Sequence, residues 1–421
     1  MRILLQAGNV WNGTDFTTED ILIQDGIVTA RGAHLDAAAD RVMDVSGKAV
    51  FPGFADVHVH LREPGFGYKE TIATGSRACA AGGYTTVCAM PNLNPAPDSP
   101  EHIRQEWELI EQDACIRVLP YASITLGQKG EGTLVDFAAL APLACGFSDD
   151  GRYVKNTEDM RIAMQQVKAQ GSIISAHCED MTLIPKGGAI HAGSFAAAHD
   201  IPGIPSESEW GAIARDIALC RETGCDYHVC HISCKESAEI IRQAKAEGVN
   251  ITCETGPHYL LLSQDDLQDE GRFKMNPPLR DEEDRKALVE ALADGTIDCL
   301  ATDHAPHSAE EKAKGLRGSA MGIVGIECAF PLLYTYLVEK GLVPLKTIID
   351  CLTVRPRARF HLDGGMAVGD RAEITVFDLQ ADTTVNPDTF LSKGKATPFA
   401  GWPVHAKCLL TICGDSVAYE E

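Results

Sequence analysis

The chain has 421 residues but no run of about 18 apolar residues, so no segment is a candidate for a membrane-spanning helix. Its first eight residues lack the long apolar core of a secretory signal peptide. Basic residues are in deficit, because 37 Lys and Arg stand against 60 Asp and Glu, for a net charge of −23. Nucleic acids and anionic membranes bind through basic surfaces, so we expect neither as a partner.

A disulfide framework is also missing. The 15 cysteines are scattered without regular spacing, and their number is odd. Several lie in apolar segments, where a thiol behaves as a small hydrophobic group, among them Cys88, Cys230, Cys253 and Cys299. We therefore expect a reducing, cytoplasmic compartment.

The central part of the chain, residues 51–364, alternates short apolar runs with longer helical ones. The predicted strands are residues 54–61, 84–90, 116–123, 145–149, 172–177, 227–232, 250–254 and 298–302. Strands that alternate with helices indicate a parallel sheet, and eight is the number that closes a (β/α)₈ barrel of the TIM type. We predict such a barrel, with its active site at the C-terminal ends of the strands.

The two ends of the chain differ from this centre. Residues 1–50 and 365–421 both contain short alternating segments separated by turn residues such as Asp25-Gly26. This pattern is typical of small antiparallel strands. The simplest arrangement joins both ends into one small β domain beside the barrel.

His58 and His60 stand two residues apart in the first predicted strand of the barrel. Side chains at positions i and i+2 of a strand point to the same side, so the two imidazoles project together. Converging imidazoles suit a borderline metal such as Zn²⁺. A single His-x-His pair is a weak signal, and its weight depends on what the other strand ends supply.

The other strand ends supply the same kinds of ligand: Asp149 and Asp150, His177, His228 and His231, and Asp303. His228 and His231 point to opposite faces of a strand, so only one can face the site. We select His231, which is nearer the C-terminal end, and interpret His228 as structural. Asp149 competes with Asp150 for the same reason. Four imidazoles and two carboxylates are enough for two metal ions about 3.5–4 Å apart.

Several longer strings carry a resemblance to a known family: His60-Leu61-Arg62-Glu63-Pro64-Gly65, Met90-Pro91-Asn92, Met275-Asn276-Pro277-Pro278-Leu279-Arg280 and Thr302-Asp303-His304-Ala305-Pro306-His307. With the His-x-His pair, they resemble the amidohydrolase superfamily and, within it, the long bacterial barrel type of the dihydroorotase family. The likeness extends over nearly the whole chain.

The resemblance implies a zinc-dependent enzyme that reversibly closes N-carbamoyl-L-aspartate to L-dihydroorotate in de novo pyrimidine biosynthesis. One zinc ion would be held by His58, His60 and Asp303, and a second by His177 and His231, with Asp150 as the bridge. A metal-bridging hydroxide would attack the ring amide carbonyl. Asp303 would take the proton of that hydroxide as general base and deliver it to the leaving nitrogen as general acid.

The substrate carries a carboxylate, which needs a fixed cationic partner. Arg62 lies two residues past His60 on the same face and can supply a bidentate fork. Asn92 and His307 would also contact the substrate carboxylate. Asn276 is a weaker candidate for contact with the ring, since a turn residue before Pro277 is an equally good interpretation.

The resemblance further implies a small-molecule partner and a homo-oligomer, and it leaves an association with aspartate carbamoyltransferase open. One rival function is that of a hydantoinase, dihydropyrimidinase or allantoinase. Many such relatives use a carboxylated lysine on the fourth strand, whereas here the strand ends Ser148-Asp149-Asp150-Gly151 and Lys155 lies beyond it. The string from Glu254 to Tyr259 is nevertheless hydantoinase-like. A catalytically silent structural homologue is the other rival, and it would be free to lose ligands that are all present here.

Overall fold

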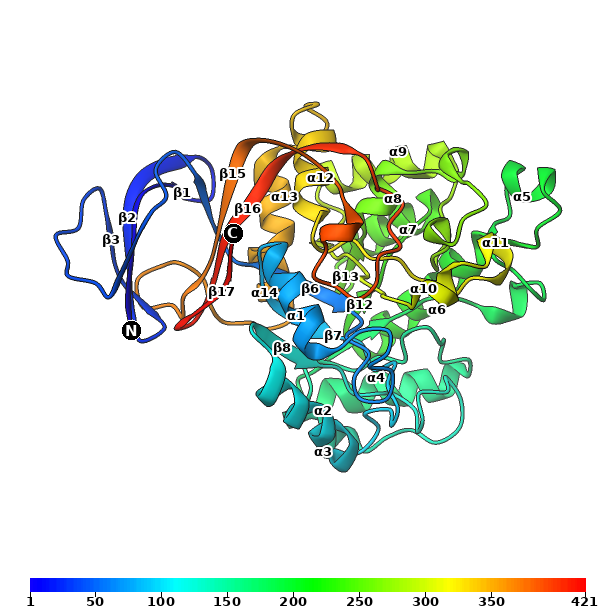
Figure 1. Ribbon diagram of the computed structural model, residues 1–421. Coiled ribbons are helices and arrows are strands. Elements are labelled where there is room, and N and C mark those ends of the chain that lie inside the picture. The colour runs from blue at the N-terminus through cyan, green and yellow to red at the C-terminus, as the bar shows by residue number, and fades with distance from the viewer.

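The computed structural model describes residues 1–421 and shows a helix-covered barrel with a β sheet at one end. In Figure 1 the N-terminal strands, in blue, lie beside the C-terminal strands, in red, on the left of the barrel. No helix combines the length and the apolar character that a membrane crossing requires. All 15 cysteines are free thiols, as the irregular spacing predicts.

Seven named strands form the barrel: β6 (Phe54–Val59), β7 (Tyr84–Ala89), β8 (Arg117–Pro120), β9 (Ile173–Ala176), β12 (Asp226–Val229), β13 (Ile251–Thr255) and β14 (Cys299–Leu300). They pair in parallel in two groups, β6-β7-β8 and β9-β12-β13-β14. A parallel bridge between Val59 and His304 joins the last strand position to the first. The ladder therefore returns to its start, as the prediction of a closed barrel requires.

The fourth predicted strand, residues 145–149, occupies its place between β8 and β9 but is short. Phe147 bridges Ala122 on one side and Ile174 on the other, both in parallel. Backbone hydrogen bonds from residues 145–148 reach both neighbouring segments. The chain leaves the ladder at Asp149, whose carboxylate accepts the backbone N–H groups of Ile124 and Thr125 at 2.8 and 3.2 Å. These hydrogen bonds satisfy backbone donors of the adjacent loop at the point where the fourth strand ends.

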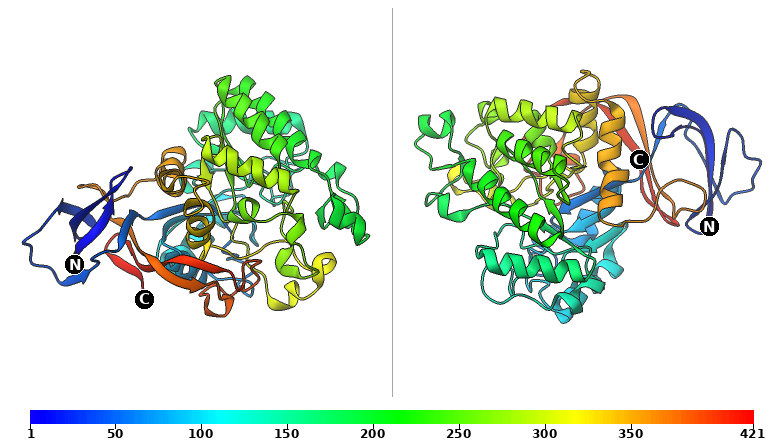
Figure 2. Two further views of the ribbon diagram at one scale, coloured as in Figure 1. Left: turned by 90° about the horizontal axis from the view of Figure 1, so that it is seen from above. Right: turned by 180° about the vertical axis from the view of Figure 1, so that it is seen from behind.

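Helices surround the barrel, and Figure 2 shows them from two further sides. The longer ones are α1 (Ile72–Ala81), α2 (Pro100–Asp113), α4 (Thr157–Ala169), α6 (Glu207–Thr223), α7 (Lys235–Ala246), α9 (Glu282–Ala293), α13 (Leu345–Leu352) and α14 (Val354–Arg359). Three of these helices have a side-chain N-cap. Thr71, Ser99 and Asn156, before α1, α2 and α4, each accept a backbone N–H of the first turn. Gly224 ends α6 with a φ of 64°, a left-handed conformation that glycine adopts without strain.

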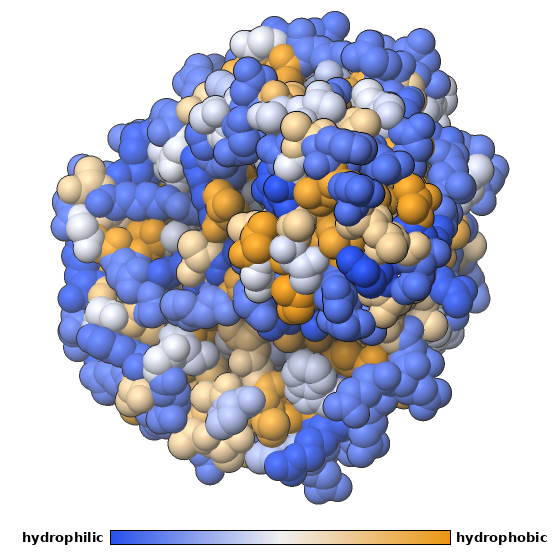
Figure 3. Space-filling view, turned by 90° about the vertical axis from the view of Figure 1, so that its left-hand side faces the viewer, coloured by the Kyte–Doolittle hydropathy of each residue, from blue (hydrophilic) through white to orange (hydrophobic).

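The terminal sheet has the strand order β17-β16-β15-β5-β1-β2-β3, with β4 beside β1. Its strands are β1 (Arg2–Trp11), β2 (Phe16–Gln24), β3 (Ile27–Gly32), β4 (Arg41–Asp44), β5 (Ala49–Pro52), β15 (Glu373–Thr384), β16 (Pro403–Cys413) and β17 (Ser416–Glu420). The surface at this end is polar, with apolar residues in small groups (Figure 3). The division into residues 1–50 with 365–421 and residues 51–364 stays a prediction.

Four phenylalanine rings join the sheet to the barrel: Phe51 of β5, Phe54 of β6, Phe377 of β15 and Phe330 of the short helix α12 (Ala329–Leu333). Each is fully buried. The ring centroids of Phe330 lie 5.1 Å from Phe54 and 4.6 Å from Phe377. Buried aromatic groups contribute about 3–5 kcal/mol each, so this cluster is a strong link between the two parts.

Candidate active site

The six predicted metal ligands meet at the C-terminal end of the barrel. They are His58, His60, Asp150, His177, His231 and Asp303, and none is more than 7 % exposed. Five of them line a cavity of about 220 Å³, and His58 lies beneath it. The strands that carry these residues are far apart in the sequence, so barrel closure is what brings the six side chains together.

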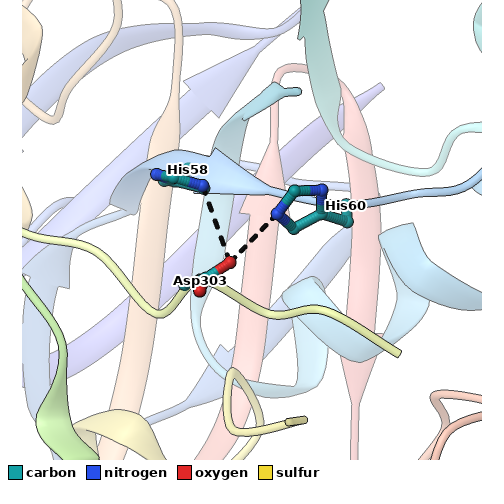
Figure 4. A group of neighbouring side chains, drawn as sticks. All are labelled: His58, His60 and Asp303. Atoms are coloured by element: carbon teal, nitrogen blue, oxygen red, sulfur yellow. Dashed lines mark hydrogen bonds and ion pairs between the residues drawn. The ribbon is translucent and has the colours of Figure 1, made fainter. Parts of the chain in front are cut away.

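His58, His60 and Asp303 form one group (Figure 4). Asp303 Oδ1 lies 3.0 Å from His60 Nε2 and 3.6 Å from His58 Nε2. Ligands placed about 2.0–2.2 Å from a tetrahedral metal lie about 3.3–3.6 Å from one another. The spacing of this group is therefore close to that of a metal site.

The Asp150 carboxylate lies between this group and the other two imidazoles. Its Oδ1 is 3.4 Å from His58 Nε2, 3.7 Å from His177 Nδ1 and 3.6 Å from His231 Nε2. Its Oδ2 is 3.7 Å from His60 Nε2. Oδ1 thus faces three of the imidazoles and Oδ2 the fourth, so the carboxylate as a whole is directed toward both sets, as a bridging ligand would be.

The donor set fits a metal in its hydrogen bonding as well. His58 Nε2 and Asp150 Oδ1 are buried and have no hydrogen-bond partner. Buried polar atoms are rarely left in this state, and a cation between them would satisfy both. Although burial opposes ionisation, the surrounding imidazoles hold the pKa of Asp150 well below its usual range. Burial also acts against the ionised Asp303, yet His60 and His58 lower its pKa to about 2.

His228 lies below the cavity rather than in it. Its Nε2 is 2.9 Å from Glu254 Oε2, and its Nδ1 is 2.8 Å from Thr252 Oγ1. Both ring nitrogens of His228 therefore have hydrogen-bond partners inside the barrel, and neither is directed into the cavity. Of the two histidines in this segment, His231 is the one that lies among the predicted ligands.

Asp149 likewise turns away from the ligand group. Besides the two N–H groups that end the fourth strand, it accepts the backbone N–H of Gly130 at 3.2 Å. It therefore organises a loop, and Asp150 is the carboxylate that faces the imidazoles. Lys155 is exposed and pairs with Glu131 at 2.8 Å, and no lysine lines the cavity.

Two carboxylates that the sequence did not single out orient the ligands. Glu254 is fully buried, and its Oε1 lies 2.6 Å from His58 Nδ1. Glu179 Oε2 lies 3.2 Å from His177 Nε2 and accepts the Asn276 amide at 2.9 Å. The sequence did carry a signal for each contact. Glu254 is a charged residue inside an apolar strand, and Glu179 lies two residues after His177, on the same side of the chain. Such partners fix the orientation of a ligating imidazole.

Three residues of the site have a left-handed backbone. The φ angles are 67° for Arg62, 32° for His231 and 45° for Asp303. Residues other than glycine seldom adopt positive φ, which costs about 1–2 kcal/mol. Strain of this kind clusters at functional sites, where the surrounding structure holds it in place.

Arg62 and Asn92 line the cavity beside the ligands. The Arg62 Nε donates to the carbonyl of Pro306 at 3.2 Å, which fixes the guanidinium. The Asn92 amide donates to the carbonyl of Asp150 at 2.7 Å, and its Oδ1 is buried without a partner. The structure therefore brings both predicted carboxylate-binding residues to the metal group.

His307 also lines the cavity, but the protein itself engages both of its ring nitrogens. Its Nε2 lies 2.7 Å from the carbonyl of Met321, and its Nδ1 lies 3.3 Å from Lys69 Nζ. Burial and the neighbouring cations of Arg62 and Lys69 lower the pKa of His307 to about 3, so the ring is neutral near pH 7. Its direct contact with a substrate carboxylate stays a prediction.

Comparisons with known proteins show which family the chain resembles. The family described as "Dihydro-orotase-like" matches residues 47–237. The chain is 49 % identical to the "Dihydroorotase" of Geobacillus sp. (strain WCH70) over 427 residues, which cover 100 % of this chain and 99 % of the relative. It is 52 % identical to that of Geobacillus thermodenitrificans (strain NG80-2) over 421 residues, with 97 % and 98 % covered.

Solved structures share the whole architecture. The L-hydantoinase (dihydropyrimidinase) from Arthrobacter aurescens superposes with a TM-score of 0.89 at 28 % identity, covering 99 % of this chain and 96 % of the other. The D-hydantoinase (dihydropyrimidinase) from Thermus sp. gives 0.84 at 26 % identity, with 99 % and 95 % covered. The predicted fold, an amidohydrolase barrel with a β domain built from the chain termini, is confirmed.

Proposed function

The chain belongs to the dihydroorotase family of cyclic amide hydrolases, and we propose that its site interconverts N-carbamoyl-L-aspartate and L-dihydroorotate with two zinc ions. Identity of about 50 % to whole-length relatives supports this reaction of pyrimidine biosynthesis. The observation that carries the proposal is the Asp150 carboxylate, which faces two sets of imidazoles beside Arg62.

In this proposal His58, His60 and Asp303 would hold one ion, His177 and His231 would hold the other, and Asp150 would contribute its carboxylate to both. When bound, the ions lower the pKa of water to about 7 and polarise the amide carbonyl. The chain presents imidazole nitrogens and carboxylate oxygens for this purpose, all of them buried. Glu254 keeps His58 Nδ1 engaged, so that Nε2 faces the cavity.

Asp303 is the proposed general base and acid. Its low pKa keeps it ionised near pH 7, so it can accept the proton of the attacking water. The same proton then goes to the ring nitrogen that leaves the carbonyl carbon. Ring closure follows the reverse order, since one group serves both directions.

Arg62 and Asn92 are proposed to hold the substrate carboxylate that takes no part in the chemistry. A guanidinium can donate two parallel hydrogen bonds to a carboxylate. The Asn92 amide already donates to the carbonyl of Asp150, which keeps the side chain at the cavity wall. Hydantoin and dihydrouracil lack such a carboxylate, so this pair selects against them.

A cyclic amidase acting on hydantoins is the second candidate function. The architecture that the chain shares with hydantoinases of known structure favours it. Two features oppose it, because no lysine lines the cavity and an arginine stands where a carboxylate would bind. We place dihydroorotate first for these reasons.

We also propose that the protein is located in the cytoplasm and forms a homo-oligomer. Fifteen free thiols support a reducing compartment. The homo-oligomer and an association with aspartate carbamoyltransferase rest on the family resemblance alone.

The deciding experiment is an assay of purified, zinc-loaded protein on L-dihydroorotate, with dihydrouracil, hydantoin and allantoin in parallel. Turnover of dihydroorotate alone is the expected result. Turnover of a ring without the carboxylate would move the protein to the hydantoinase function. Absence of turnover on every ring, with metal bound, would contradict both. Metal analysis of the same sample tests the expected two zinc ions per chain.

A further inference from the structure

Lys312 is a buried lysine that has no acidic partner. It ends the short helix α10 (Ala309–Lys312), in the loop that follows the last barrel strand, and is 8 % exposed. It forms no salt bridge. Its ammonium instead donates to three backbone carbonyls, those of Lys274 at 3.0 Å, Ala320 at 2.7 Å and Gly322 at 2.6 Å.

This arrangement matches the chemistry of an ammonium group, which has three donors and no acceptor. Burying an ammonium without a counter-charge is costly, whereas Lys314 on the same loop is exposed and bears no such cost. The three carbonyls come from two segments that are distant in sequence. Lys312 therefore ties the segment at residue 274 to the turn at residues 320–322.

Both tied segments reach the cavity. Asn276 lies two residues beyond Lys274, and Met321 stands between the two anchored carbonyls of Ala320 and Gly322. Asn276, Met321 and Gly322 all line the cavity. The backbone N–H of Gly322 also donates to the carbonyl of Lys274 at 3.0 Å, so the two segments touch directly at the anchor point.

The turn then holds His307. With the carbonyls of Ala320 and Gly322 directed to Lys312, the carbonyl of Met321 between them accepts from His307 Nε2 at 2.7 Å. Because His307 Nε2 donates to this carbonyl, its approach to Arg62 Nη2 at 3.4 Å is a packing contact rather than a hydrogen bond. A continuous set of contacts thus leads from the buried ammonium, through one turn, to the guanidinium beside the metal group.

We propose that Lys312 is a positioning residue for substrate binding, which holds the 320–322 turn and Asn276 so that His307 and Arg62 keep their places at the cavity. The proposal rests on the proposed function of this site. It assigns no chemical step to Lys312, which touches neither the ligands nor the cavity. Its effect should appear in the Michaelis constant, because the groups that it holds contact substrate rather than the reacting atoms.

The test compares Lys312→Met with Lys314→Met. Both changes remove one ammonium from the same loop, but Lys314 is exposed and its side chain has no hydrogen-bond partner. We expect Lys312→Met to raise the KM for L-dihydroorotate about tenfold, with bound metal unchanged and kcat lowered less than about threefold. Lys314→Met should match the wild type. A purely structural role would reduce the active fraction and leave the KM of the remainder unchanged.

Lys312→Arg covers the case in which Lys312→Met does not fold. Arginine keeps the charge, but its planar fork cannot meet three converging carbonyls, so we expect an intermediate KM. A wild-type KM in the folded variants would overturn the proposal. Trypsin gives a readout independent of turnover, since loss of the tether should speed cleavage after Lys314 or Arg317. If the wild type turns over no ring, the proposed function fails, and unchanged cleavage would separately reject the tether.

Discussion

His58 Nδ1 lies 2.6 Å from Oε1 of Glu254, two residues separated by 196 positions in the chain. The other oxygen of the same carboxylate lies 2.9 Å from His228 Nε2. Glu254 therefore contacts both His58, a proposed metal ligand, and its structural neighbour His228. A carboxylate in this position fixes the orientation of the imidazole and increases its basicity.

Glu254→Gln should weaken metal binding about 10- to 100-fold, because the amide keeps the shape of the side chain but loses its charge. Titration of metal-free protein with zinc, in competition with a chelator, measures this change. Glu239→Gln, an exposed glutamate on α7, is the matched control. An unchanged zinc affinity in Glu254→Gln would show that Glu254 serves only to pack the barrel.

Asp303→Asn should lower kcat about 10²- to 10⁴-fold, since it removes the group that carries the proton. Most of the metal should be retained, because His58, His60 and Asp150 remain. Steady-state rates in both directions, with metal analysis of the same sample, check both expectations. Near-normal turnover would remove Asp303 from its acid–base role.

Arg62→Ala should raise the KM for L-dihydroorotate about 10- to 100-fold, as expected for the loss of a charged hydrogen bond worth about 1.5–3 kcal/mol. Dihydrouracil, which lacks the carboxylate, is the internal control. Any slow turnover of that ring should be affected little. Arg62→Lys should not restore the KM, because an ammonium cannot form the parallel pair of hydrogen bonds. Equal losses on both rings would contradict the carboxylate contact.

Glu327 should make the stability of the protein depend on pH. Burial raises its pKa from 4.5 to about 7, although its carboxylate accepts the backbone N–H of Leu391 at 2.8 Å. The folded state therefore retains a proton that the unfolded state releases near pH 4.5. The free energy of unfolding should fall as pH rises through this range, by about 3 kcal/mol in total by pH 8.

Glu327→Gln removes that titration and keeps an oxygen for the Leu391 N–H. The stability difference between this variant and the wild type should therefore grow in favour of the variant from pH 5 to pH 8. Denaturant unfolding at three pH values in this range measures it. A constant difference across the range would mean that Glu327 titrates normally.

The sequence by itself predicted the architecture and the residues that lie at the C-terminal ends of the strands. The alternation of apolar runs and helices predicts the barrel, because short apolar runs rich in β-branched residues and separated by helices are typical of the buried strands of a parallel sheet. The His58-x-His60 spacing predicts a shared direction for two imidazoles, since strand geometry is local. Placement of Asp303 at a strand end follows from the same pattern.

The tertiary structure separated Asp150 from Asp149 and revealed partners. Asp150 faces the cavity, whereas Asp149 accepts backbone N–H groups of a neighbouring loop. The choice of His231 over His228 was already available from strand geometry, and His231 lines the cavity. The Glu254 contact and the three carbonyls around Lys312 join segments distant in sequence. Such distances depend on how the barrel closes and how its loops fold back, and no local pattern of residues encodes them.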